Sequence, residues 1–128
     1  MPQAGESRDI QDRAFRFACG LVSACERLIR RGGVAALIGR QLAAAGTSIG
    51  ANLEEACGAQ SRPDFVAKVS IALKEARETR YWLRLVIATQ HPIPADASAL
   101  RRESDELVAI LTVILRNARS NRGESEDR

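Results

Sequence analysis

The sequence has few of the residues on which most catalytic and metal sites depend. It has one histidine, His91, and three cysteines, Cys19, Cys25 and Cys57, with no CxxC pair among them. A Ser or Cys nucleophile needs an adjacent base, metal sites in helix bundles use repeated ExxH motifs, and phosphate-cradling loops use patterns such as GxxxxGK(S/T). The sequence lacks all three, so we expect no enzyme activity, no cofactor and no metal.

Aromatic residues and long apolar runs are also scarce. Aromatics make up 4% of the chain and hydrophobic residues 45%, so Ala, Leu, Ile and Val must form the core, which suits closely packed helices. No stretch reaches the roughly 18 uncharged apolar residues of a membrane span, and the amino-terminal MPQAGESRDIQDR lacks the apolar core of a signal peptide. We expect no membrane partner and a cytoplasmic location, where unpaired cysteines stay reduced.

Three short breaks rich in Gly and Pro divide the chain, at residues 32–33, 58–63 and 91–94. Between them, apolar residues recur at spacings of three and four, which predicts helices. The predicted helices span about 7–31, 34–57, 62–90 and 95–121. Loops this short give antiparallel neighbours, so residues 1–119 are predicted to form an all-α, up-down-up-down four-helix bundle. Residues 120–128, SNRGESEDR, are predicted to be a disordered tail.

Each predicted helix has one apolar stripe that would form the core. The stripes comprise Ile10, Ala14, Phe17, Leu21, Ala24 and Leu28; Leu37 or Ile38 with Leu42, Ala45, Ile49, Leu53 and Ala56; Phe65, Val69, Ala72, Ala76, Thr79, Leu83 and Val86; and Leu100, Leu107, Leu111, Ile114, Leu115 and Ala118. The third helix has a second apolar face, formed by Val66, Leu73, Trp82 and Leu85. Apolar surface beyond one core usually marks an interface, so we predict a homo-oligomer.

The second helix contains Gly39, Gly46 and Gly50. Each glycine in a helix interior is unfavourable by about 1 kcal/mol relative to Ala. A compensating reason is close packing, because two backbones can approach more nearly where one has no side chain.

The chain is mildly basic, with a formal net charge of +3 and only two lysines, Lys68 and Lys74, among its 19 basic residues. An antiparallel bundle brings the end of the first and third helices beside the start of the second and fourth. Arginine suits bidentate phosphate contacts, so this end is a candidate nucleic-acid surface. Its arginines are Arg27, Arg30, Arg31, Arg40, Arg80, Arg84, Arg101 and Arg102, partly offset by Glu26, Glu78, Asp96, Glu103 and Asp105.

A second set of polar residues borders the apolar stripes of the second and third helices. Its members are Gln41, Ser48, Asn52, Glu55, Glu75 and Glu78. One interpretation is a structural polar network that fixes helix register or a subunit interface. The alternative is a binding site.

The stretch from Gln41 to Leu85 resembles a known family signature. It contains SIGANLEEA, then a short Ser/Arg loop, a DF pair and IALKEARETRYWL. The matching residues are Gln41, Ser48, Ile49, Asn52, Glu55, Ala56, Ser61, Asp64, Phe65, the run from Ile71 to Glu75, Glu78, Thr79, Tyr81, Trp82 and Leu83. The signature is similar to that of the bacterial four-helix-bundle proteins named for open reading frames within intervening sequences of 23S rRNA genes.

That resemblance implies a four-helix bundle assembled as a pentameric ring, with a biochemical role that is largely unassigned in the family. A related branch is the accessory variability protein of diversity-generating retroelements, in which a basic pentamer binds nucleic acid and a reverse transcriptase. The leading hypothesis is therefore a non-enzymatic oligomeric scaffold that binds RNA or DNA weakly through its arginine-rich end. A protein-interaction module with no nucleic-acid role is the alternative.

Overall fold

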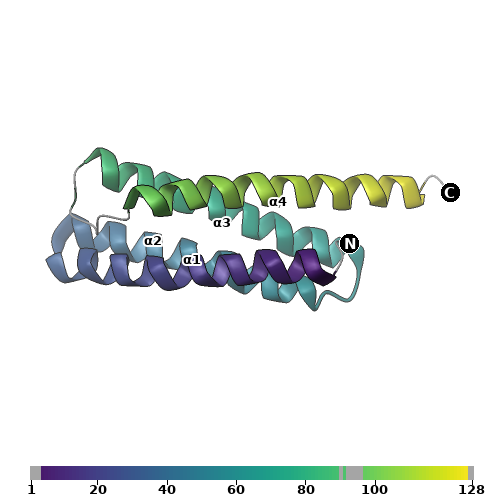
Figure 1. Cartoon of the computed structure of the whole chain (residues 1–128), viewed down its shortest axis with the longest axis horizontal. Coiled ribbons are helices and arrows are strands. Elements are labelled where there is room, and N and C mark those ends of the chain that lie inside the picture. The colour runs from purple at the N-terminus through teal and green to yellow at the C-terminus, as the bar shows by residue number, and fades with distance from the viewer. Residues whose placement is uncertain (1–3, 90, 92–96, 127–128) are drawn as a thin grey trace.

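The computed structural model describes residues 4–89, 91 and 97–126, and the side chains of residues 9–89, 91 and 97–120. This part of the chain forms four helices: α1 (Ala4–Arg31), α2 (Gly33–Cys57), α3 (Arg62–Ala88) and α4 (Ala97–Glu126). Consecutive helices run antiparallel, so the α1–α2 turn lies at the same end as the last turn of α3 and the first turn of α4 (Figure 1). The predicted all-α, up-down four-helix bundle is confirmed.

The helix ends differ most from the prediction in two places. Helix α1 begins at Ala4 rather than at residue 7. Helix α4 continues to Glu126, so residues 120–126 belong to a helix rather than to a disordered tail. A helix that is already nucleated extends by one hydrogen bond per added residue, which favours continuation through a polar sequence. The predicted boundaries at residues 90 and 95, and the last two residues of the predicted tail, lie outside the described residues.

The turn between α1 and α2 is a single residue, Gly32. Gly32 has φ 76° and Gly33 has φ 59°, in the left-handed region that side chains other than hydrogen disfavour. The Gly32 amide donates to the Ile29 carbonyl at 3.1 Å, and the Gly32 carbonyl accepts from the Ala36 amide at 3.2 Å. The glycine pair therefore reverses the chain without an intervening loop.

Helix α3 begins with a side-chain cap at Ser61. Ser61 has an extended backbone, and its hydroxyl accepts a hydrogen bond from the Asp64 amide at 3.2 Å. Pro63 lies in the first turn, where its missing amide hydrogen leaves no unmade helical bond.

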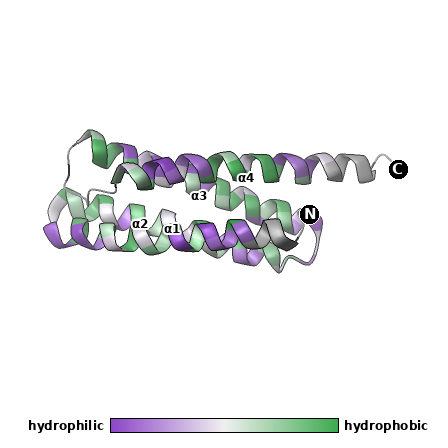
Figure 2. Cartoon of the chain, in the orientation of Figure 1, coloured by the Kyte–Doolittle hydropathy of each residue, from purple (hydrophilic) through white to green (hydrophobic). Residues whose placement is uncertain are grey.

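The core contains the predicted stripes of all four helices. Of the predicted core residues, only Ile114 and Leu37 are not fully buried: Ile114 is half-buried, and Ile38 rather than Leu37 faces inward. Cys25 and Val108, which the sequence does not single out, also lie in the core. Hydrophobic and hydrophilic segments alternate along each helix (Figure 2), as expected for helices with one buried face.

The second apolar face of α3 is only partly covered within the single chain. Leu73 is buried, while Val66, Trp82 and Leu85 are half-buried against the core. Leu73 lines a groove beside α4, whereas Trp82, nine residues further along, lies on the opposite side of the helix. Three large apolar side chains of α3 remain exposed, Ile71, Tyr81 and Ile87, and Tyr81 contacts the ring of Trp82. The others are Phe15, Val22, Val34, Leu37 and Val113.

Helices α1 and α2 approach closely at two of the three predicted glycines. A Cβ added at Gly46 would overlap Leu21 Cδ2, and one added at Gly39 would lie 2.9 Å from Leu28 Cβ. A Cβ at Gly50 would meet Ala14 Cβ at an ordinary 3.8 Å. Close packing therefore explains Gly39 and Gly46 but does not require Gly50.

Helices α1 and α4 are the adjacent pair with the fewest contacts, whereas each of the other three adjacent pairs packs extensively. A hollow of about 300 Å³ lies between them, with Arg13, Phe17, Leu100 and Glu103 in its lining. Arg13 spans this seam, because its guanidinium donates to Glu103 at 2.8 Å and to Glu106 at 3.0 Å.

Candidate nucleic-acid interface

All eight predicted arginines lie in the half of the bundle that contains the α1–α2 turn, because this end gathers residues from all four helices. Seven are exposed and Arg80 is half-buried. Arg30 donates its Nε–H to the Glu26 carbonyl at 3.4 Å. Five of the eight have no carboxylate oxygen within 4 Å and no side-chain hydrogen bond among the described residues: Arg27, Arg31, Arg40, Arg84 and Arg102.

The acidic residues of this end neutralise fewer arginines than the sequence indicates. Asp105 lies 3.9 Å from both Arg80 Nη1 and Arg101 Nε, which are long contacts. Glu103, counted from the sequence among the offsetting acids, pairs instead with Arg13 of α1. Its pKa is lowered by the Arg13 hydrogen bonds, against a smaller opposing effect of burial. The arginine-rich end is therefore more positive than the residue count implies.

Apolar side chains accompany the arginines at the start of α2 and the end of α3. Val34 and Leu37 are 65% and 57% exposed, and Ile87 is 38% exposed. These exposures leave apolar surface beside the cations, so the end combines electrostatic and hydrophobic contact groups.

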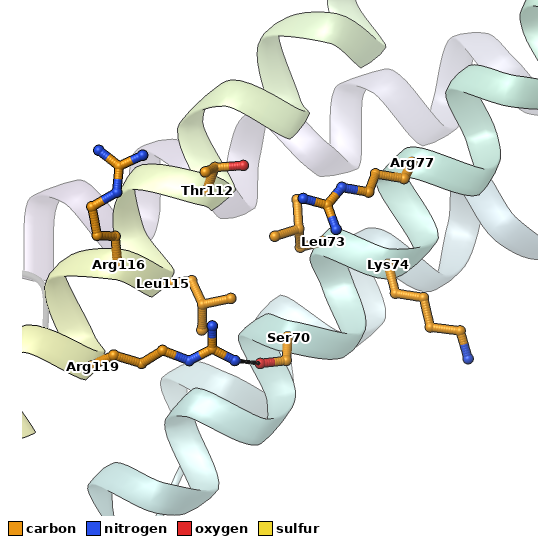
Figure 3. Close-up of a pocket in the computed structure, with 8 residues that line it drawn as sticks. All are labelled: Ser70, Leu73, Lys74, Arg77, Thr112, Leu115, Arg116 and Arg119. Carbon is orange, nitrogen blue, oxygen red and sulfur yellow. Dashed lines mark hydrogen bonds between the residues drawn. The ribbon is translucent and has the colours of Figure 1, made fainter.

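A second cationic surface, which the sequence analysis did not single out, lies in a groove of about 420 Å³ between α3 and α4 (Figure 3). Its lining consists of Ser70, Leu73, Lys74, Arg77, Thr112, Leu115, Arg116 and Arg119. Lys74 and Arg77 form one pair of cations on α3, and Arg116 and Arg119 form another on α4. The members of each pair are three residues apart, a spacing that places both on one side of a helix. The sequence contains that signal on each helix, but only the register between α3 and α4 brings the pairs together.

The six residues of the predicted polar network do not form one hydrogen-bonded cluster within the described chain. On α2, Ser48 donates to the Ala44 carbonyl at 2.7 Å and Asn52 donates to the Ser48 carbonyl at 2.8 Å. Gln41 is exposed. The contact between helices is made by Glu55, whose Oε2 lies 2.9 Å from Lys68 Nζ of α3.

Glu75 and Glu78 are neighbours on α3, separate from the α2 members. Glu78 accepts a hydrogen bond from Trp82 Nε1 at 3.4 Å. Burial and the neighbouring Glu78 raise the pKa of Glu75, while Lys74 acts in the opposite direction. The charged form of Glu75 is therefore disfavoured in the folded chain.

An exposed phenylalanine marks the outer groove between α1 and α2. Phe15 is 68% exposed and lines a hollow of about 430 Å³ together with Ala18, Gly50 and Ala51. Glu54 and Glu55 lie in the same lining. A large aromatic side chain at the edge of a small-residue groove is a candidate contact for another protein surface.

Two features are absent from the described residues. No three His, Cys, Asp or Glu side chains are grouped so that they could hold a metal ion. None of the four helices, as far as they are described, has the length and apolar content of a membrane-crossing segment.

Comparison with known proteins places this geometry in a family. The sequence matches the 23S rRNA-intervening sequence protein family over residues 6–113. The chain belongs to this family. The matched range includes all eight arginines of the predicted surface but ends before Arg116 and Arg119 of the α3–α4 groove.

A solved structure supports the same assignment. A crystallised protein of unknown function from the S23 ribosomal protein family of Bacteroides thetaiotaomicron is 36% identical to this family member. The match covers 87% of this chain and 98% of that chain, with a TM-score of 0.77. No protein with a curated description matches the sequence.

Proposed function

We propose that this protein is a non-enzymatic helical scaffold that self-associates and binds RNA or DNA weakly through its arginine-rich end. The observation that carries the proposal is the group of exposed arginines that lack carboxylate partners there, Arg27, Arg31, Arg40, Arg84 and Arg102. They come from all four helices, so the folded bundle is required to assemble them. Arginine binds phosphate oxygens through paired N–H donors, which makes a polyanion the matching ligand.

Self-association forms the second part of the proposal. Phe15, with the groove of small residues beside it, supports self-association. A pentameric ring, as the family resemblance implies, would repeat the arginine-rich end around one axis and sum its field. Light scattering at micromolar concentration should give a mass several times the 13.9 kDa of one chain, and Phe15→Ser should lower it. A monomer for the unaltered protein would contradict this part.

The nucleic-acid part is tested by fluorescence anisotropy with labelled single-stranded RNA and DNA, from about 50 to about 200 mM salt. The triple variant Arg27→Gln, Arg31→Gln, Arg40→Gln should bind more weakly. The slope of log K against log salt concentration should also become shallower by about 0.7 for each lost phosphate contact. Arg16→Gln is the matched control, because Arg16 is an exposed arginine of α1 outside this surface. No binding by the unaltered protein at low salt would eliminate the nucleic-acid part.

A protein-binding module is the second candidate function. Phe15 favours it, because an aromatic anchor beside a groove is a typical protein contact. A partner in native extract that is retained after nuclease treatment and lost with Phe15→Ser would favour this candidate. A partner lost on nuclease treatment would favour nucleic-acid binding.

A further inference from the structure

The groove between α3 and α4 is separated from the arginine-rich end by the contact of Arg80 with Asp105. Beyond that contact, Arg77 and Ser70 on α3 face Thr112 and Arg119 on α4. The lining contains four cations and no carboxylate. The groove is therefore a distinct cationic surface, not an extension of the proposed one.

Elsewhere between the helices, three described cations each lie opposite an acid. Arg13 faces Glu103, Lys68 faces Glu55 and Arg80 faces Asp105. In the groove, Lys74, Arg77, Arg116 and Arg119 make no salt bridge to any described acidic residue, although the charge of Lys74 does act on Glu75. Four cations on two facing helices repel one another, so an anionic ligand would stabilise this arrangement.

Two arginines of the lining are directed toward the space between the helices. Figure 3 shows Arg77 extending toward α4, and Arg119 reaching across to Ser70, with 3.5 Å between Nη2 and Oγ. Lys74 and Arg116 extend away from that space (Figure 3). The buried Leu73 and Leu115 form an apolar floor. Arg77 and Arg119 can therefore contact a ligand in the groove, while the other two cations add charge at its edges.

The spacing of the two arginines indicates the kind of ligand. Arg119 lies at the Ser70 end, and Arg77 is seven residues further along α3, which corresponds to about 10 Å of helix. One phosphate is too small to contact both ends, whereas successive phosphates of a strand can. The lining has no aromatic side chain on which a base could stack.

We infer that the groove between α3 and α4 binds the phosphodiester backbone of a single RNA or DNA strand without base selectivity. This inference rests on the proposed function for the class of ligand and adds a second, separate site to it. Arg77 and Arg119 form the paired phosphate contacts, and the Ser70 hydroxyl, which accepts from Arg119, retains its own hydrogen for a phosphate oxygen.

The test uses the full chain, labelled oligo-U and oligo-dT strands, and anisotropy titrations from about 50 to about 200 mM salt. The double variant Arg77→Gln, Arg119→Gln should bind both strands about tenfold more weakly at low salt. The slope of log K against log salt concentration should become shallower by about 1.4, because two phosphate contacts to a single strand are lost. Arg16→Gln is the control. Because Arg77 and Arg119 are exposed, unchanged circular dichroism and light scattering should accompany the loss.

The outcomes distinguish this inference from the proposed function. Equal binding by the groove variant and the unaltered protein, with loss only in the Arg27, Arg31, Arg40 variant, would overturn the inference and leave the proposed function standing. Loss of binding only in the groove variant would support binding in the groove and would contradict binding at the arginine-rich end. No binding by the unaltered protein would overturn both.

Two further arms identify the source of the phosphate. Inorganic phosphate at the same phosphate concentration should not displace the strand, and vesicles with anionic lipid should not bind through Arg77 and Arg119. Displacement by inorganic phosphate, or vesicle binding abolished in the double variant, would overturn the inference. If the double variant changes the oligomeric mass, the single variant Arg77→Gln decides: unweakened binding by that variant would also overturn it.

Discussion

Arg13 of α1 donates hydrogen bonds to both carboxylate oxygens of Glu103 of α4. The distances are 2.8 Å from Nε to Oε2 and 2.8 Å from Nη2 to Oε1. The two residues are 90 positions apart in the chain, and they join the two helices that otherwise contact each other least. Arg13 Nη2 also lies 3.0 Å from Glu106. Both side chains are about one-third exposed, so solvent weakens the attraction but does not remove it.

This pair should contribute measurable coupling to the stability of the bundle. Arg13→Met and Glu103→Gln should each lower the free energy of unfolding by about 1 kcal/mol, because a bidentate pair exceeds an ordinary surface salt bridge. The double variant should lose little more than either single variant. Urea unfolding of all four proteins measures the coupling, with Arg27→Met as the control, because Arg27 is an exposed arginine of α1 without a carboxylate partner among the described residues. Fully additive losses would contradict it.

The same pair predicts a pH dependence. Arg13 lowers the pKa of Glu103 in the folded chain, relative to about 4.3 in an unfolded one. The contribution to stability is therefore present above the unfolded pKa and is lost as pH falls through the folded pKa. The stability difference between the unaltered protein and Glu103→Gln should shrink as pH is lowered from about 6 to about 3. A difference that stays constant over this range would refute the assignment.

Two glycines of α2 should respond in opposite directions to alanine. Gly46→Ala should lower the free energy of unfolding by about 1 to 2 kcal/mol, because its Cβ would overlap the buried Leu21. Gly50→Ala should raise it by about 0.5 to 1 kcal/mol, because a Cβ there meets ordinary contacts and alanine favours the helix. Thermal and urea unfolding compare the pair. Equal effects would show that helix propensity, not packing, dominates.

Neutralising Glu75 should stabilise the folded chain at neutral pH. Burial and Glu78 raise its pKa, so the charged form disfavours folding, and this disadvantage develops as pH rises from the unfolded pKa through the folded one. Glu75→Gln should therefore raise the melting temperature at pH 7 and lose that advantage as pH falls below the unfolded value, about 4.3. Glu54→Gln, at an exposed glutamate of α2, is the control. A lower melting temperature at pH 7 would indicate that charged Glu75 has a stabilising partner.

Local patterns determined much of this fold. The period of apolar residues located four helices and nearly every buried side chain, including all seven predicted for the first face of α3. Short-range chemistry also located the Gly32-Gly33 turn. These features depend on residues within one turn of each other, and such interactions are visible in the sequence.

The sequence pattern did not predict features that depend on contacts between helices. The sequence grouped Leu73 and Trp82 on one face of α3, but Leu73 is buried beside α4, whereas Trp82 is half-buried on the opposite side of the helix. Glu103 was assigned to the arginine-rich end, but Arg13 holds it across the seam between α1 and α4. Each helix offers several acids and bases on its polar face, and the pattern along one helix does not select among partners on another.

The sequence by itself determined the number of helices, their direction and the side of each that is buried, because these follow from local periodicity and short loops. It also determined that eight arginines lie at the end of the bundle with the α1–α2 turn, because antiparallel helices place the end of α1 and α3 beside the start of α2 and α4. Only the tertiary structure decided that Arg77 and Arg119 share a groove without an acid. That depends on the rotation and axial shift of α3 against α4, which side-chain packing sets and no local pattern encodes.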